Sequence, residues 1–186
     1  DLYYTCKQLG LYLFIDGARL GYGLAAPTGD LSAADIAKFS DVFTVGGTKM
    51  GALFGEAVVI NNPELNVRFR YMIKQKGGML AKGRLLGLQF SELLKDGLYF
   101  ELSKHAYDLA MKLKKALTEA GVEFLVDSPT NQQFPILEDR VLKGLDEKYS
   151  YCYQQRMDET HSAVRFCTGW ATQPEHVDSL IADIRA

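Results

Sequence analysis

The hydrophobic residues of the first part of the chain combine one helical spacing with short continuous runs. Apolar side chains at positions 2, 3, 6 and 9 predict a helix that ends at Gly10. Largely apolar runs at residues 11–15, 41–45 and 56–60 predict strands, and we expect the first to be buried on both faces. Ser32 and Asp35 form the pattern of a capping box, which predicts a short helix through Phe39. The order strand, helix, strand predicts a parallel sheet with a right-handed crossover.

The rest of the chain begins with helical spacing and then mixes strands with helices. Residues 63–96 have helical spacing, and residues 98–120 predict a long amphipathic helix that ends at Gly121. Candidate strands follow at residues 122–126, 133–137, 149–154 and 163–167, and a helix is predicted at 174–184. We therefore predict two domains, residues 1–96 and residues 97–186. Because the chain opens inside a helix without an initiator methionine, we expect it to be the later part of a longer protein.

Composition excludes several functional classes. The 186 residues are 47% hydrophobic, which predicts a sizeable folded core. The net charge of -2 argues against a nucleic-acid partner. No apolar run reaches the roughly 18–20 residues needed to cross a bilayer, so we expect no membrane partner. The three cysteines, Cys6, Cys152 and Cys167, are widely spaced and predict reduced thiols in a reducing, cytoplasmic compartment.

Charged side chains follow the first two predicted strands. Asp16 comes directly after the first strand, and Lys49 follows the second, 49 − 16 = 33 residues later. That separation is about one βαβ unit, and ligands bind at the carboxyl ends of parallel strands. A carboxylate and an amine there suit a pyridine-ring aldehyde cofactor, with Lys49 forming a Schiff base and Asp16 keeping the pyridine nitrogen protonated. Either residue alone is better interpreted as an ordinary loop residue, whereas the pair favours the functional interpretation.

The residues next to the lysine suit the same ligand. Gly47 lets the backbone approach a flat ring, and the Thr48 hydroxyl is placed to bind a phosphate. His105, His161 and His176 lack the spacing of metal ligands, so we expect no metal. His161, which precedes the last candidate strand, remains a minor candidate for approaching the site.

Two segments resemble those of a known family. Residues 15–20 (IDGARL) resemble the DGAR segment of the low-specificity threonine aldolases. Residues 46–57 (GGTKMGALFGEA) resemble the cofactor-lysine segment of a bacterial-type branch of that family. The resemblance runs in register over most of the chain and is strongest in residues 10–60. The family is part of the β-eliminating lyase group, within the aspartate-aminotransferase-like fold of pyridoxal-phosphate (PLP) enzymes.

The resemblance implies an α/β fold and a role for each matching residue. Residues 1–96 would be the C-terminal part of the large, parallel-sheet PLP-binding domain, and residues 97–186 the small C-terminal domain. Lys49 carries the cofactor and Asp16 pairs with its pyridine nitrogen. Arg19 contacts the cofactor's phenolic oxygen or the substrate carboxylate. Arg165 clamps the substrate α-carboxylate, for which a guanidinium is a natural bidentate partner.

The implied activity is the retro-aldol cleavage of a β-hydroxy-α-amino acid, such as threonine or allo-threonine, into glycine and an aldehyde. Two alternatives stay open. One is a PLP-dependent β-eliminating amino-acid lyase, and the other is an inactive fragment that serves only as a structural half. The resemblance also implies a homodimer or homotetramer, because this fold usually builds its active site across a dimer.

Overall fold

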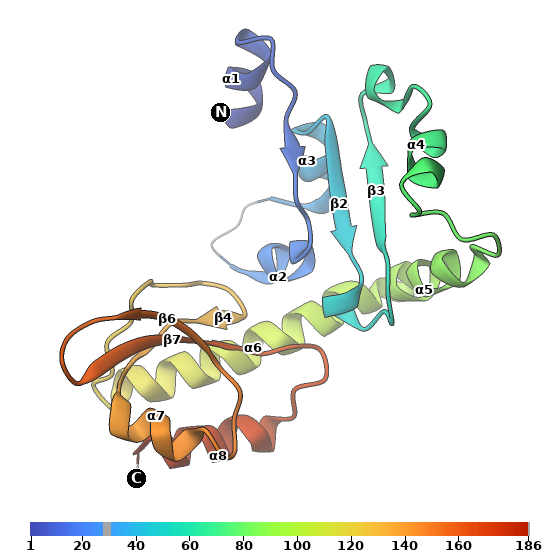
Figure 1. Ribbon diagram of the computed structural model, residues 1–186. Coiled ribbons are helices and arrows are strands. Elements are labelled where there is room, and N and C mark those ends of the chain that lie inside the picture. The colour runs from blue at the N-terminus through green and yellow to red at the C-terminus, as the bar shows by residue number, and fades with distance from the viewer. Residues whose placement is uncertain (28–30, 186) are drawn as a thin grey trace. The chain divides into compact units, whose positions relative to one another are not determined.

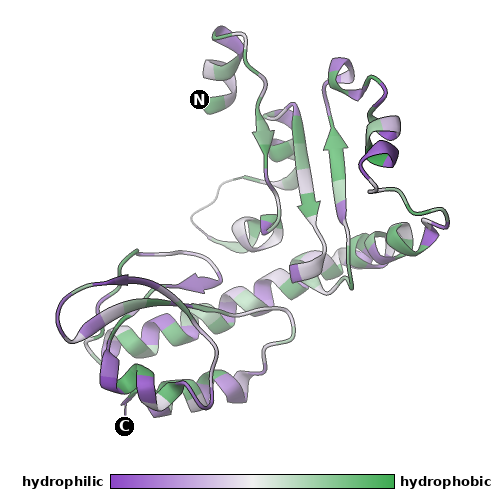
Figure 2. Cartoon of the chain, viewed as in Figure 1, coloured by the Kyte–Doolittle hydropathy of each residue, from purple (hydrophilic) through white to green (hydrophobic). Residues whose placement is uncertain are grey.

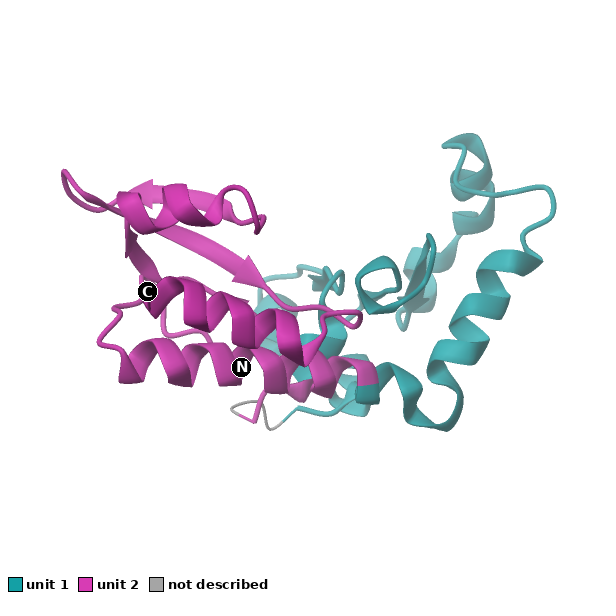
Figure 3. Ribbon diagram, turned by 90° about the horizontal axis from the view of Figure 1, so that it is seen from below, with its two compact units in different colours: residues 1–24, 29–101 teal, residues 25–28, 102–186 magenta. Residues whose placement is uncertain are grey.

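The computed structural model describes residues 1–27 and 31–185 (Figure 1). They divide into two compact units, one of residues 1–24 and 29–101 and the other of residues 25–28 and 102–186 (Figure 3). The elements that precede the long helix are α1 (Leu2–Gln8), β1 (Phe14–Ile15), α2 (Leu20–Ala25), α3 (Ala33–Lys38), β2 (Val42–Gly46), the 3-10 helix η1 (Thr48–Met50), β3 (Glu56–Ile60), η2 (Pro63–Asn66), α4 (Phe69–Gln75), α5 (Arg84–Leu94) and η3 (Lys95–Gly97). The elements that follow are α6 (Leu98–Glu119), β4 (Gln132–Gln133), β5 (Ile136–Glu138), α7 (Asp139–Leu145), β6 (Cys152–Arg156), β7 (His161–Cys167) and α8 (Pro174–Arg185).

The first unit contains a sheet with the strand order β1-β2-β3. β1 and β2 run parallel with α3 between them in the sequence, as predicted. β3 pairs with β2 in the antiparallel direction, so the sheet is mixed rather than wholly parallel. The reason is the short link at residues 47–55, because a parallel return needs a crossover of a dozen or more residues.

Local signals placed several helix ends correctly. Ser32 and Asp35 form the predicted capping box at the start of α3, with each side chain bonded to the other residue's backbone N–H. Gly10 and Gly121 follow α1 and α6 with φ of 69° and 79°, a backbone conformation that favours glycine. These signals depend on neighbouring residues alone, which is why the sequence reveals them.

Other predictions were wrong where tertiary contacts decide. Only residues 14–15 of the run 11–15 form a strand, and Phe14 is 57% exposed rather than buried on both faces. β1 has one neighbouring strand in the part of the chain that the structure describes, so its apolar side chains lack cover. The Gly- and Ala-rich segment after it, predicted as a loop, contains α2, and α7 was not predicted at all. Residues 122–126 form a single bridge, between Phe124 and Pro135, instead of a strand.

The second unit packs its helices against one face of an antiparallel sheet. β7 lies at the centre and pairs with β4, β5 and β6. The core includes Val164 and Phe166 of β7, together with side chains of α6 and α8 such as Leu113 and Val177. Figure 2 shows the hydrophobic positions as stripes along α6 and α8. Each fully buried large aliphatic side chain contributes about 1.5–3 kcal/mol, which accounts for the cohesion of this unit.

Candidate functional site

The chain segments that follow β1 and β2 are held side by side by backbone hydrogen bonds. Ile15 lies opposite Phe43 in parallel register. The N–H of Gly17 donates to Thr44 Oγ1 at 2.8 Å, and the N–H of Gly46 donates to the Gly17 carbonyl at 3.0 Å. Asp16 and the turn that carries Lys49 therefore leave the sheet at the same edge. We call residues 16–19 and 46–49 the strand-end platform.

Two glycines permit this close approach. A Cβ on Gly17 would lie 1.7 Å from the Thr44 carbonyl oxygen, and one on Gly46 would lie 2.5 Å from the Ala18 carbonyl oxygen. Both neighbours are backbone atoms, so no side-chain rotation would relieve the overlap. The platform therefore requires glycine at both positions.

Two tyrosines support the lysine turn. The Tyr22 hydroxyl donates to the Lys49 carbonyl, and the Tyr99 hydroxyl donates to the Gly46 carbonyl at 3.3 Å. Tyr99 is 2% exposed, and burial raises the pKa of its hydroxyl, which stays protonated and able to donate. Sequence reasoning missed both tyrosines: Tyr22 lies in the segment predicted as a loop, and Tyr99 is distant in sequence.

The charged side chains of the platform are available to a ligand. Asp16 is exposed, and its Oδ1 accepts the N–H of Ala18 at 3.0 Å in a local turn. Arg19 and Lys49 are half-buried, and the structure shows no hydrogen bond or ion pair to either side chain within residues 1–27 and 31–185. Thr48 is exposed beside them. This edge therefore carries one carboxylate, whose Oδ1 accepts a local backbone N–H, and two cationic side chains that have no partner among the described residues.

This donor set fits the cofactor that the sequence predicts. A half-buried amine suits carbonyl chemistry, and a carboxylate suits a protonated ring nitrogen. Gly47 is buried, and its neighbours leave no room for a side chain. A Cβ at this position would lie 2.8 Å from the Phe90 ring and 3.0 Å from Ala52 Cβ. The backbone of the lysine turn is therefore tightly packed against Phe90 and Ala52, whereas the Lys49 side chain remains partly exposed.

Arg165 belongs to the second unit. It lies in β7, where its Nη2 donates to Cys152 Sγ at 3.4 Å, and its buried Nε has no hydrogen-bond partner. The hydrogen bond to Cys152 raises the pKa of Arg165. The guanidinium therefore stays charged and keeps hydrogen-bonding capacity for an anion.

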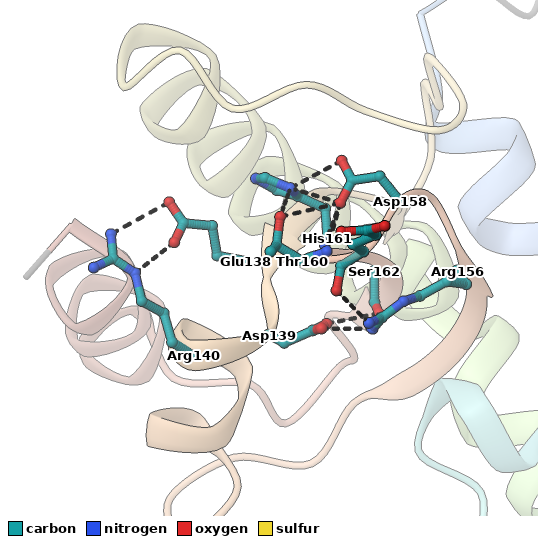
Figure 4. A network of polar contacts seen from close by, with 9 residues as sticks. Glu138, Asp139, Arg140, Arg156, Asp158, Thr160, His161 and Ser162 are labelled. Carbon is teal, nitrogen blue, oxygen red and sulfur yellow. Dashed lines mark hydrogen bonds and ion pairs between the residues drawn. The ribbon is translucent and has the colours of Figure 1, made fainter.

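The remaining histidine candidate has a local role. His161 begins β7 and pairs with Asp158 at 3.0 Å, next to a second set of contacts in which Asp139 binds Arg156 and Ser162 (Figure 4). A cavity of about 600 Å³ borders His161, lined by residues of the second unit that include Glu123 and Met157.

Within the described residues, no group of three or more His, Cys, Asp and Glu side chains could hold a metal ion. None of the helices that the structure describes combines the length and apolar character of a membrane span.

The turn between β6 and β7 supplies a pH-dependent prediction. Asp158 Oδ1 accepts the N–H groups of Thr160 at 2.7 Å and His161 at 2.8 Å, and these bonds lower the pKa of Asp158 from 3.8 to about 2. A carboxyl whose pKa falls on folding stabilises the native state above its unfolded pKa. That contribution is lost as the pH falls from 3.8 to about 2. We expect Asp158→Asn to lower the melting temperature at neutral pH, with the difference from the unsubstituted protein closing across this window.

Thermal unfolding at a series of pH values checks this result. Glu159→Gln is the matched control, because it removes a carboxylate of the same turn whose side chain forms no hydrogen bond that the structure shows. A difference between Asp158→Asn and the unsubstituted protein that persists unchanged below pH 2 would contradict the assignment.

Comparisons with known proteins agree over almost the whole chain. A low specificity L-threonine aldolase from a Pseudomonas species is 33% identical over 191 residues, which cover 98% of this chain and 52% of that protein. The structure of Leishmania major threonine aldolase matches with a TM-score of 0.96 at 40% identity, covering 100% of this chain and 54% of that one. The chain thus spans about half the length of the relatives it matches. No protein-family model matches it.

More distant structures match in fold alone. Sphingomonas wittichii serine palmitoyltransferase has a TM-score of 0.68 at 14% identity over 99% of this chain and 49% of its own. A Mycobacterium tuberculosis lysine aminotransferase has a TM-score of 0.56 at 14% identity, over 99% of this chain and 43% of its own. These matches confirm the predicted aspartate-aminotransferase-like α/β fold of the PLP enzymes. The resemblance to the low-specificity threonine aldolases is confirmed as well.

Proposed function

We propose that the whole protein is a PLP-dependent aldolase that cleaves threonine or allo-threonine into glycine and an aldehyde. The observation that carries this proposal is the strand-end platform, where Asp16 and Lys49 leave one sheet edge on hydrogen-bonded neighbouring turns. Its support is the similarity to proteins named low specificity L-threonine aldolase along 98% of the chain.

The platform residues would hold the cofactor. Lys49 would bind it covalently through Nζ, Asp16 would pair with the ring nitrogen, and Thr48 would bind the phosphate over the backbone of Gly47. Arg19 would contact the ring's phenolic oxygen or the substrate carboxylate. When bound, PLP supplies the electron sink for the pair released when the Cα–Cβ bond breaks.

The remaining steps would fall to this chain's own side chains. Asp16 would keep a proton on the ring nitrogen, because a carboxylate beside that nitrogen favours its cationic form. Arg19 and Arg165 would orient the amino-acid carboxylate through charge-assisted hydrogen bonds. The proton of the substrate β-hydroxyl would pass either to a base that precedes this chain or to Lys49 Nζ once the entering amino acid has displaced it from the cofactor.

Product analysis tests the reaction. The whole protein, supplied with PLP, is incubated separately with L-threonine, L-allo-threonine, L-serine and L-cysteine, and the products are identified by mass spectrometry. Glycine and acetaldehyde from threonine or allo-threonine support the aldolase. Pyruvate from serine or cysteine without glycine from threonine would replace it with a β-eliminating lyase. No product from any substrate would favour the non-catalytic alternative.

We also propose that the protein works as a homodimer or homotetramer in the cytoplasm. The first unit exposes large apolar side chains, among them Leu53 at 81%, Tyr71 at 75% and Val67 at 65%, which water disfavours. The cysteines, all of which are described, form no disulfide, in keeping with a reducing compartment. Light scattering that finds a monomer at micromolar concentration would overturn the oligomer.

A further inference from the structure

The face of β7 that carries Arg165 also carries two cysteines. Val164 and Phe166 of β7 point into the core, so the alternate residues Arg165 and Cys167 lie on the opposite face. Cys152 of β6 stands directly across from Arg165 in the antiparallel register. Of the chain's three cysteines, the two exposed ones therefore flank a single arginine.

The Arg165 guanidinium contacts a sulfur atom. Arg165 Nη2 donates to Cys152 Sγ at 3.4 Å, and within the described residues no ion pair involves Arg165. Its Nε is buried without a hydrogen-bond partner. Among residues 1–27 and 31–185, no carboxylate pairs with this positive charge, which lies against an exposed thiol.

The two thiols differ in their contacts. Cys167 Sγ donates to Gln132 Oε1 at 3.9 Å, on the neighbouring strand. Cys152 Sγ instead accepts the guanidinium hydrogen bond, so its lone pairs face the positive charge. Cys152 stands directly across from Arg165 and accepts its hydrogen bond, whereas Cys167 lies two residues further along β7, the strand of Arg165 itself.

We propose that Cys152 is a modification site for small anionic disulfides, directed by the charge of Arg165. The attacking species is the Cys152 thiolate, whose proton passes to water. Its sulfur forms a bond to one sulfur of the reagent, the reagent's S–S bond breaks, and the second sulfur leaves as a thiolate with the electron pair. Cys152 is oxidised and the reagent is reduced, and a carboxylate on the attached half then pairs with Arg165.

Labelling kinetics with two reagents test the site. The whole protein is treated with the anionic disulfide 5,5′-dithiobis(2-nitrobenzoate) and with the neutral 2,2′-dithiodipyridine, and the labelled cysteine is identified by peptide mass spectrometry. We expect Cys152 to react first with the anionic reagent. Arg165→Gln should slow the reaction of Cys152 with the anionic reagent about tenfold, the lower end of the effect of local charge on encounter rates. The rate of labelling by the neutral reagent should change less than about twofold.

Two controls separate charge from a disturbed fold. Arg140→Gln removes one positive charge from α7, where Arg140 pairs with Glu138, and should leave both rates unchanged. In the unsubstituted protein, salt at about 1 M shortens the Debye length to about 3 Å and should reduce the preference for the anionic reagent without any substitution. Equal slowing of both reagents, insensitivity to salt, or first labelling at Cys6 or Cys167 would overturn the proposal.

The consequence for substrate binding rests on the proposed function. If Arg165 clamps the substrate carboxylate, labelling Cys152 should raise KM for threonine more than it lowers kcat. Cys152→Ser should keep the KM that it has before treatment. Anion-selective labelling with an unchanged KM would leave the thiol site standing and would show that the carboxylate role of Arg165 is wrong.

Discussion

Lys49→Ala is expected to abolish cofactor attachment and to lower kcat/KM for threonine by a factor of about 10³ or more. The reason is that Lys49 supplies the amine that would hold PLP, and no other lysine belongs to the strand-end platform, residues 16–19 and 46–49. The visible absorbance of the amine-bound cofactor should disappear with it. Absorption spectra and steady-state kinetics of the whole protein, with PLP added, measure both effects.

A matched control guards against a general loss of positive charge. Lys74→Ala removes an exposed lysine of α4 and should retain the spectrum and the activity. Folding of Lys49→Ala should be nearly normal, because its side chain forms no hydrogen bond or ion pair in the part of the chain that the structure describes. Retained colour and activity in a folded Lys49→Ala protein would show that the lysine is wrongly assigned.

Gly17→Ala is expected to cost more than about 3 kcal/mol of unfolding free energy, the upper end of overpacking effects. The new methyl group would lie 1.7 Å from the Thr44 carbonyl oxygen. Relief requires β1 and β2 to separate, which breaks the bond from the Gly17 N–H to Thr44 Oγ1. Urea unfolding of the purified variant measures the loss, and cofactor binding should fall with it.

Gly23→Ala is the control, six residues further along. Gly23 lies within α2, and a Cβ there meets no atom within 4 Å. Alanine at such a helical position should stabilise by about 0.5–1 kcal/mol. A Gly17→Ala protein as stable as Gly23→Ala would mean that the two turns do not approach as closely as the hydrogen bonds indicate.

The spacing of residues along the sequence predicted part of the candidate site. The separation of Asp16 and Lys49 by one strand–helix–strand unit predicts a shared sheet edge, and β1 and β2 do run parallel. The roles of Tyr22 and Tyr99 could not be predicted, because their hydroxyls bond to backbone carbonyls that only the folded chain brings close. Their contribution depends on register and burial rather than on a local pattern.

In the second unit, too, a local pattern was predictable from the sequence and a pairing between strands was not. The amphipathic spacing of α6 predicted its length within a residue or two at each end, because one apolar stripe repeats along it. The pairing of Cys152 with Arg165 was not predictable, because the register between β6 and β7 shifts at an irregularity between Tyr153 and Gln155. A one-residue shift moves every side chain to the other face of a strand.

The sequence by itself determined several helix ends, the parallel β1–β2 pair and the family resemblance, which in turn implied the fold class. Each of these depends on the types and order of residues that lie close together in the sequence. Only the tertiary structure decided that β3 runs antiparallel, that β1 is short and exposed, and that Arg165 lies against Cys152. These features arise from contacts between residues distant in sequence, whose free energy depends on register and packing that no single segment specifies.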